Sequence, residues 1–129
     1  MGGMVVIAID NDPRILEGMQ ALLKQWDCTP VCAESRDDAV KLLVGAELSP
    51  DIILADYHLA DSENGLDVVL SLRARYGAEL PAILITADRT PEVRDRAAEE
   101  NVYVLHKPVK PASLRALLSQ TRVARTAAE

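Results

Sequence analysis

The stretch Ile52-Ile53-Leu54-Ala55-Asp56 places four apolar residues directly before an aspartate. Three further apolar runs also end at side chains suited to phosphate chemistry. In chain order, the four runs end at an acid, an acid, a hydroxyl and an amine. The three further runs are residues 5–9 before Asp10, residues 82–85 before Thr86, and residues 102–105 before His106 and Lys107. Short runs of Val, Ile, Leu and Ala without polar alternation are typical of strands that are buried on both faces of a parallel sheet.

Helical patterns lie between these runs and complete an α/β fold. Apolar residues within 15–26 recur along one helix face, and Pro13 suits the first turn of that helix. A further strand at residues 29–33 contains Pro30, which favours an edge position because proline has no N–H to donate. Five strands and five helices then alternate, a (βα)5 series. Right-handed crossovers predict a doubly wound, five-stranded parallel sheet with helices on both faces.

The fourth helix is the least firmly specified. It begins near Thr90, and only Val93, Ala97 and Ala98 offer apolar anchors before Asn101. We therefore expect it to be the most loosely packed helix of the fold.

Length and composition predict one domain over residues 1–129. With 49% apolar residues, the chain can bury a core of the usual single-domain size. Residues 1–3 resemble an added leader. The last helix begins at Pro111, and we expect it to fray over about residues 122–129.

The charge and the cysteines exclude several classes of function. A net charge of −6 argues against a nucleic-acid or anionic membrane surface. There is no secretory signal pattern and no apolar stretch long enough to span a membrane, so we predict a cytoplasmic protein without membrane contact. Cys28 and Cys32 are the only cysteines and have no histidine nearby. They are predicted to be reduced structural thiols rather than zinc ligands.

The polar residues at the four strand ends are expected to meet. In open parallel α/β sheets, functional groups gather outside the carboxyl ends of the strands. Carboxylates there attract Mg²⁺, while an ammonium and a hydroxyl can hold phosphoryl oxygens. The strand ends therefore predict a phosphoryl-transfer site.

This arrangement resembles the receiver domain of bacterial two-component response regulators, over nearly the whole chain. The resemblance implies a flavodoxin-like sheet with strand order 2-1-3-4-5. It makes Asp56 the phosphoacceptor, with Thr86 and Lys107 contacting the phosphoryl group, and it makes Pro108 a candidate cis proline. For the Mg²⁺ site it implies Asp10, Asn11, Asp56 and the backbone carbonyl of His58, with Asp12 as a further candidate.

Three features depart from the receiver pattern. Asn11 stands where receivers usually have a second acid, so Mg²⁺ binding should be weaker unless Asp12 compensates. Val104 stands where an aromatic residue is usual, and Tyr103 should point to the opposite face. The loop after Asp56 is one residue longer than the common pattern. The Asp-Asn-Asp-Pro stretch at 10–13 and the Asp-Tyr-His-Leu run at 56–59 together resemble the C-terminal receivers of hybrid sensor histidine kinases.

The implied function is Mg²⁺-dependent phosphorylation of Asp56 in a His-Asp phosphorelay. The domain is then no enzyme beyond self-phosphorylation and autodephosphorylation at Asp56. Its expected partner is a histidine kinase or a histidine phosphotransfer domain, docked near Pro13, Arg14 and Ile15, with a weak homodimer as an open alternative. The parent chain would be a hybrid histidine kinase.

Two other functions fit parts of the pattern. An unphosphorylated pseudo-receiver that serves only as an interaction module would explain Asn11 and Val104. A haloacid-dehalogenase-like phosphatase also uses an Asp-x-Asp after its first strand, followed by Thr or Ser and then Lys. Its nucleophile would be Asp10, but the acidic pair expected after the lysine is replaced here by Pro108-Val109-Lys110-Pro111.

Overall fold

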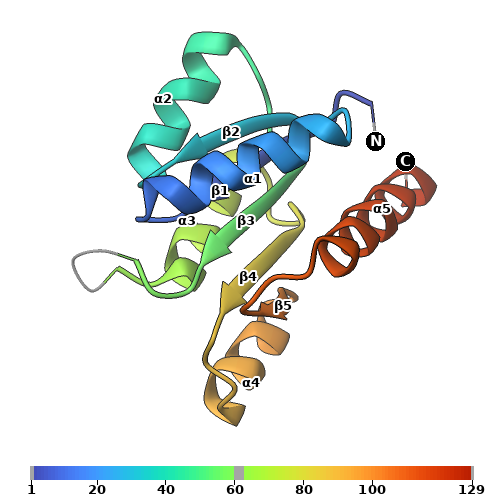
Figure 1. The fold of residues 1–129 in the computed structure, drawn as a ribbon. Coiled ribbons are helices and arrows are strands. Elements are labelled where there is room, and N and C mark those ends of the chain that lie inside the picture. Colours follow the sequence, from blue (N-terminus) through green and yellow to red (C-terminus); the bar gives the residue numbers. More distant parts are fainter. Residues whose placement is uncertain (1, 60–62, 129) are drawn as a thin grey trace.

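The computed structural model describes residues 2–59 and 63–128, with side chains up to Arg122. Within these residues, strands and helices alternate as the predicted (βα)5 series (Figure 1). The strands are β1 (Val5–Ile9), β2 (Thr29–Ala33), β3 (Ile52–Asp56), β4 (Ala82–Thr86) and β5 (Tyr103–His106). The helices are α1 (Pro13–Gln25), α2 (Arg36–Ala46), α3 (Gly65–Tyr76), α4 (Pro91–Glu99) and α5 (Pro111–Ala128).

The sheet is parallel and has the strand order β2-β1-β3-β4-β5, which confirms the predicted order. Pro30 lies on β2, at one edge of the sheet, where its missing N–H costs no ladder bond on the outer side. Asp56 pairs with Ile85, and Thr86 pairs with His106. The carboxyl ends of β3, β4 and β5 therefore lie level with one another.

Alternate residues of each central strand enter two separate cores. Ile7 and Ile53 belong to a cluster with side chains of α2, α3 and α4. Val6 and Leu54 belong to a cluster with side chains of α1 and α5 on the other face. In Figure 1, α1 crosses in front of the strands. Burial on both faces explains why these strands read as continuous apolar runs.

Side-chain caps fix the starts of α2 and α3, as the sequence indicates. Ser35 accepts a hydrogen bond from the N–H of Asp38 at 3.2 Å, and Asn64 accepts one from the N–H of Leu66 at 2.7 Å. Thr90 occupies the corresponding position before α4 but makes no side-chain cap bond.

The anchoring of α4 is thinner than predicted. Val93 and Ala97 are buried, at 5% and 1% exposure. Ala98 is exposed, so the prediction that it anchors α4 is wrong. One residue along a helix turns the side chain by about 100°, which carries Ala98 away from the sheet. The strand that follows begins at Tyr103 rather than at Val102, because the N–H of Val102 closes α4 by donating to the carbonyl of Ala97 at 2.9 Å.

The last helix is longer than predicted. It continues to Ala128, whereas we expected it to fray from about residue 122. Its final turns are rich in Ala and Arg, which are strong helix formers. Leu114 and Leu118 are fully buried against the sheet. The guanidinium of Arg115 lies over the ring of Trp26, 5.8 Å from its centroid, and so links α5 to the end of α1.

Candidate functional site

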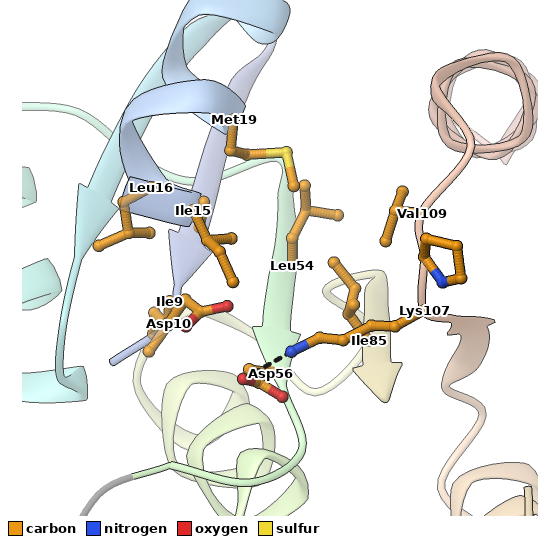
Figure 2. Close-up of a pocket in the computed structure, with 12 residues that line it drawn as sticks. Ile9, Asp10, Ile15, Leu16, Met19, Leu54, Asp56, Ile85, Lys107 and Val109 are labelled. Carbon is orange, nitrogen blue, oxygen red and sulfur yellow. Dashed lines mark hydrogen bonds and ion pairs between the residues drawn. The ribbon is translucent and has the colours of Figure 1, made fainter. Parts of the chain in front are cut away.

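Three of the four polar strand ends reach one crevice. Asp10 follows β1, Asp56 ends β3, and Lys107 follows β5. Figure 2 shows Lys107 reaching across from the far side of the crevice toward Asp56, with Asp10 nearby at the end of β1. All three line one pocket of about 520 Å³.

Lys107 and Asp56 form an ion pair in this crevice. The Nζ atom of Lys107 lies 3.1 Å from Oδ2 of Asp56. The other carboxylate oxygen, Oδ1, accepts a hydrogen bond from the N–H of His58 at 3.3 Å. Asp56 is only 7% exposed, so its carboxylate is held in place and kept largely from water. The Lys107–Pro108 peptide bond is cis, the isomer expected of Pro108.

Asp10 is a second buried carboxylate, at 6% exposure. Burial raises the pKa of Asp10, and the charge of Asp56 raises it further. The N–H of Asp12, which donates to Oδ1 of Asp10 at 2.9 Å, and the ammonium of Lys107 both lower the pKa, but they do not outweigh burial. The crevice thus holds two carboxylates and a single ammonium. The arrangement favours an added cation.

Gly65 brings α3 against the backbone of Asp56. A Cβ atom added at Gly65 would lie 2.1 Å from the carbonyl oxygen of Asp56, far inside the contact limit. The N–H of Gly65 donates to the carbonyl of Tyr57 at 2.8 Å. In the sequence, Asn64-Gly65 indicates only the start of a helix. The close approach of Gly65 depends on a contact that no local pattern reveals.

Thr86 is buried beside the ion pair and is tied into the next loop. At 1% exposure, its Oγ1 accepts a hydrogen bond from the N–H of Asp88 at 3.0 Å. Asp88 in turn accepts the N–H of Thr90 at 2.8 Å. These bonds to Thr90 hold the pKa of Asp88 below its usual range, and electrostatic interactions with the nearby His58 and His106 add a smaller contribution. Asp88 was not among the site residues predicted from the sequence, although an Asp two residues before a helix-starting Thr is a turn signal.

Asp12 and Asn11 lie just before α1, and only Asp12 has a side-chain role at the start of this helix. Oδ1 of Asp12 accepts the N–H of Arg14 at 2.9 Å, and Oδ2 forms an ion pair with the Arg14 guanidinium at 3.3 Å. Hydrogen bonds from the Arg14 side chain and backbone lower the pKa of Asp12. Asp12 therefore serves as the helix cap. The Asn11 side chain is exposed.

Among residues 2–59 and 63–128, no group of three His, Cys, Asp or Glu side chains is placed to hold a metal ion. Asp10 and Asp56 are the two carboxylates that line the crevice within the described residues. His58 is exposed, and its ring meets that of Tyr57 edge to face at 4.9 Å. Residues 60–62 of this loop lie outside the described part of the chain.

The pocket beside the ion pair is lined mainly by apolar side chains. Ile15 and Met19 reach it from α1, Val109 from the segment before α5, and Leu54 and Ile85 from the sheet (Figure 2). The docking residues predicted from the sequence, Pro13, Arg14 and Ile15, are all exposed. Ile15 is 40% exposed and lines the pocket, so this candidate docking surface adjoins the acidic site directly.

Position 104, where receivers usually have an aromatic residue, is a valine in this chain. Val104 is partly buried and packs against the core on the α4 face. Tyr103 is 44% exposed, as strand alternation predicts for a side chain that does not share the face of Val104. Position 104 therefore carries no aromatic ring that could exchange places with Thr86.

Residues 6–119 match the family model described as the response regulator receiver domain. The chain belongs to this family. Receiver domains act in two-component signalling and are signalling modules rather than enzymes in their own right. The fit of the family model covers all four strand ends that carry the site.

Individual relatives agree on this fold. The phyllosphere-induced regulator PhyR of Methylorubrum extorquens is 35% identical over 118 residues, which are 89% of this chain and 42% of that protein. The structure of the anti-anti-sigma factor PhyR from Bartonella quintana matches with a TM-score of 0.77 and 26% identity, over 99% of this chain and 51% of that one. The Vibrio cholerae chemotaxis protein CheY4 matches with a TM-score of 0.80 and 20% identity, over 93% of this chain and 99% of that one. This receiver thus spans about half the length of the PhyR relatives, or less.

No helix in the described part of this receiver has the length and apolar character needed to span a membrane.

Proposed function

We propose that this receiver accepts a phosphoryl group on Asp56 from a phosphohistidine of a partner protein. The ion pair between Lys107 Nζ and Asp56 Oδ2 at 3.1 Å carries the proposal. It holds the buried carboxylate in place and puts a cation where phosphoryl oxygens would arrive. A carboxylate that served only to stabilise the fold would not need a position at the mouth of an open pocket.

The reaction transfers the phosphoryl group from nitrogen to oxygen. A carboxylate oxygen of Asp56 forms a bond to phosphorus while the bond between phosphorus and the donor imidazole nitrogen breaks, and the imidazole leaves with the electron pair. Lys107 turns from the carboxylate toward the new phosphoryl oxygens. The Thr86 hydroxyl can donate to one of them once it moves toward the site. Hydrolysis of the acyl phosphate later restores the Asp56 carboxylate.

The oxygen donors at the site suit Mg²⁺. Carboxylates of Asp10 and Asp56, the amide oxygen of Asn11 and the backbone carbonyl of His58 are hard ligands of the kind that Mg²⁺ accepts, together with water. Burial, and to a lesser extent the charge of Asp56, raises the pKa of Asp10. A divalent cation between the two carboxylates would neutralise their charge. When bound, the ion supplies charge neutralisation for the arriving phosphoryl group. Asn11 is a neutral ligand and weakens the site relative to an acid.

The surface around Ile15 suits the donor protein. A phosphohistidine side chain must reach Asp56 from outside, and the apolar pocket between α1 and the segment before α5 opens beside that path. An apolar side chain of a histidine kinase or a histidine phosphotransfer domain can fill it while the imidazole approaches Asp56. Pro13, Arg14 and Ile15 form the rim of this docking surface.

The wider context of the domain remains a prediction. The loop sequence after Asp56 favours a hybrid histidine kinase, whereas the 35% identity to a PhyR regulator favours a role in which the receiver controls an attached or associated regulatory protein. An unphosphorylated interaction module is the second candidate function, favoured by Asn11 and by Val104 in place of an aromatic residue.

Phosphorylation can be tested by mass spectrometry. The protein is incubated with acetyl phosphate and Mg²⁺, and the intact mass is compared for wild type, Asp56→Asn and the control Asp88→Asn. We expect one phosphate on wild type and on the control, and none on Asp56→Asn. If Asp56→Asn still gains a phosphate, Asp56 is not the phosphorylation site. If wild type gains none, the domain is instead an unphosphorylated interaction module.

A further inference from the structure

Arg73 is a buried cation outside the phosphorylation site. It lies on α3, one turn before the end of that helix, and is only 9% exposed. Burial lowers the pKa of Arg73, but an arginine keeps its proton inside proteins because its ordinary pKa is so high. Such a group needs strong partners to offset the loss of water.

Within the described part of the chain, the Arg73 guanidinium donates its hydrogen bonds to three backbone carbonyls. Nε donates to the carbonyl of Leu80 at 2.8 Å, in the connection between α3 and β4. Nη1 donates to the carbonyl of Glu100 at 2.6 Å, and Nη2 donates to that of Asn101 at 3.1 Å. Glu100 is the C-cap of α4, and Asn101 follows it in the left-handed conformation. Arg73 therefore holds the C-terminal end of a helix that is 27 residues away along the chain.

This contact suits the end of a helix. The last carbonyls of a helix have no partner within the helix, and the helix dipole places partial negative charge there. The Arg73 guanidinium supplies both hydrogen bonds and positive charge. Ala97, the most buried residue of α4 at 1% exposure, lies in the same last turn.

The N-terminal end of α4 is held quite differently. Thr90 makes no side-chain cap bond, and the first helical bond, from the N–H of Arg94 to the carbonyl of Thr90, is long at 3.4 Å. The N–H of Thr90 instead donates to Asp88, whose own N–H donates to Oγ1 of Thr86. This end of α4 is thus linked to the hydroxyl beside Asp56.

We propose that Arg73 is a positioning residue that fixes the C-terminal end of α4, so that phosphorylation acts on the N-terminal end of this helix alone. The second half of this statement rests on the proposed phosphorylation of Asp56. When the Thr86 hydroxyl turns to a phosphoryl group, it releases the N–H of Asp88, and the loop before α4 rearranges and becomes ordered in its new position. The C-terminal end stays on Arg73, and α4 pivots about it.

The anchor can be tested in the free protein by amide hydrogen exchange of wild type, Arg73→Met and Arg73→Lys. Met keeps much of the aliphatic bulk, and Lys keeps the charge but cannot reach three carbonyls at once. We expect exchange over residues 97–102 to rise roughly tenfold or more in Arg73→Met, the usual effect of losing hydrogen bonds to a charged group. The exchange rate of Arg73→Lys over residues 97–102 should lie between those of wild type and Arg73→Met. Residues 5–9 and 52–56 should keep their protection in all three proteins. Equal exchange over residues 97–102 in all three proteins overturns the anchor.

The pivot is tested on wild type, which avoids any effect of the variants on folding. Beryllofluoride with Mg²⁺ serves as the phosphoryl mimic, and the Nε–H signal of Arg73 is followed by NMR together with the α4 amides. We expect changes over residues 87–94 while the Arg73 signal and residues 97–102 stay as they were. Loss of the Arg73 signal, or equal change along the whole helix, overturns the pivot. If the mimic changes no signal, including the amide of Thr86, both the proposed phosphorylation and the pivot are wrong. The anchoring role of Arg73 is then decided by the exchange of the Arg73 variants alone.

Discussion

The ammonium of Lys107 and the carboxylate of Asp56 meet at 3.1 Å although 51 residues separate them in the chain. The side chain of Asp56 is 8% exposed and that of Lys107 is 32% exposed, so water reaches the pair from the lysine side only. This geometry makes the pair part of both the stability and the chemistry of the domain.

Replacement of Lys107 by Met should destabilise the protein and slow phosphorylation. The change leaves Asp10 and Asp56 without their ammonium, and we expect a loss of about 1–3 kcal/mol, since Lys107 is only partly buried. Urea unfolding without Mg²⁺ measures the stability, and acetyl phosphate labelling measures the rate. Lys110→Met, which removes an exposed lysine three residues further on, is the matched control. Equal losses in both variants would contradict a special role for Lys107.

Replacement of Asn11 by Asp should tighten Mg²⁺ binding. A new charge facing the ion contributes roughly 1–2 kcal/mol at moderate effective dielectric. Titration calorimetry compares wild type, Asn11→Asp and the control Asp12→Asn. Because Asp12 caps α1 and pairs with Arg14, its replacement should lower stability with little effect on Mg²⁺ affinity. A large loss of Mg²⁺ affinity in Asp12→Asn would identify Asp12 as a ligand instead.

Replacement of Gly65 by Ala should disrupt the site. The added methyl would collide with the carbonyl oxygen of Asp56, which is backbone and can move only with β3. We expect a loss of roughly 1–3 kcal/mol or more and slower labelling of Asp56. Gly18→Ala is the control, since Gly18 lies within α1 with open space around it and should gain up to about 1 kcal/mol. Thermal unfolding distinguishes the two, and equal stability of both variants would contradict the close approach at Gly65.

The buried carboxylate of Asp10 should give a characteristic pH dependence. Its pKa is raised above the ordinary value of 3.8, so the folded protein holds the proton longer than the unfolded chain does. The resulting stability is present below about pH 3.8 and is lost as the pH rises through the folded pKa. Urea unfolding of wild type and Asp10→Asn at several pH values without Mg²⁺ should therefore diverge, with wild type losing more as the pH rises. Parallel profiles would rule out a raised pKa, and added Mg²⁺ should stabilise wild type more than Asp10→Asn.

Phosphorylation should order the loop and the start of α4 through Thr86. Hydrogen exchange over residues 88–101 should slow when beryllofluoride is added to wild type. The slowing should vanish in Thr86→Ala and persist in Thr86→Ser, which keeps the hydroxyl. Within this range, the pivot places the change before residue 97. If Thr86→Ala gains the same protection as wild type, Thr86 does not transmit the effect of phosphorylation to α4.

The sequence predicted the sheet and the polar strand ends because both depend on local patterns. Apolar runs such as residues 52–55 fit either strands buried on both faces or buried helices. Because the runs are too short for helices, they indicate strands. Asp56 and Lys107 were recognisable since each directly follows such a run. The bounds of the elements were less certain, as the later start of β5 and the longer α5 illustrate.

Contacts between distant segments could not be predicted. Arg73 looks like an ordinary charged residue of a helix end, and only the fold brings Glu100 to it. Gly65 looks like a helix start, and only the fold places Asp56 behind it. Ala97 lies four residues after Val93 and so shares its helix face, whereas Ala98 lies five residues after it. A helix with so few apolar residues offers only this one spacing to indicate which alanine faces the sheet.

The position of Trp26 between the end of α1 and Arg115 of α5 has a practical consequence. It is the only tryptophan in the chain, and it packs against the core on the face opposite α4. Its fluorescence is therefore an intrinsic reporter of one side of the sheet. A donor protein that settles between α1 and α5 should alter the emission even with Asp56→Asn, whereas rearrangement of α4 alone should leave the emission unchanged. One optical signal can thus separate recognition from activation.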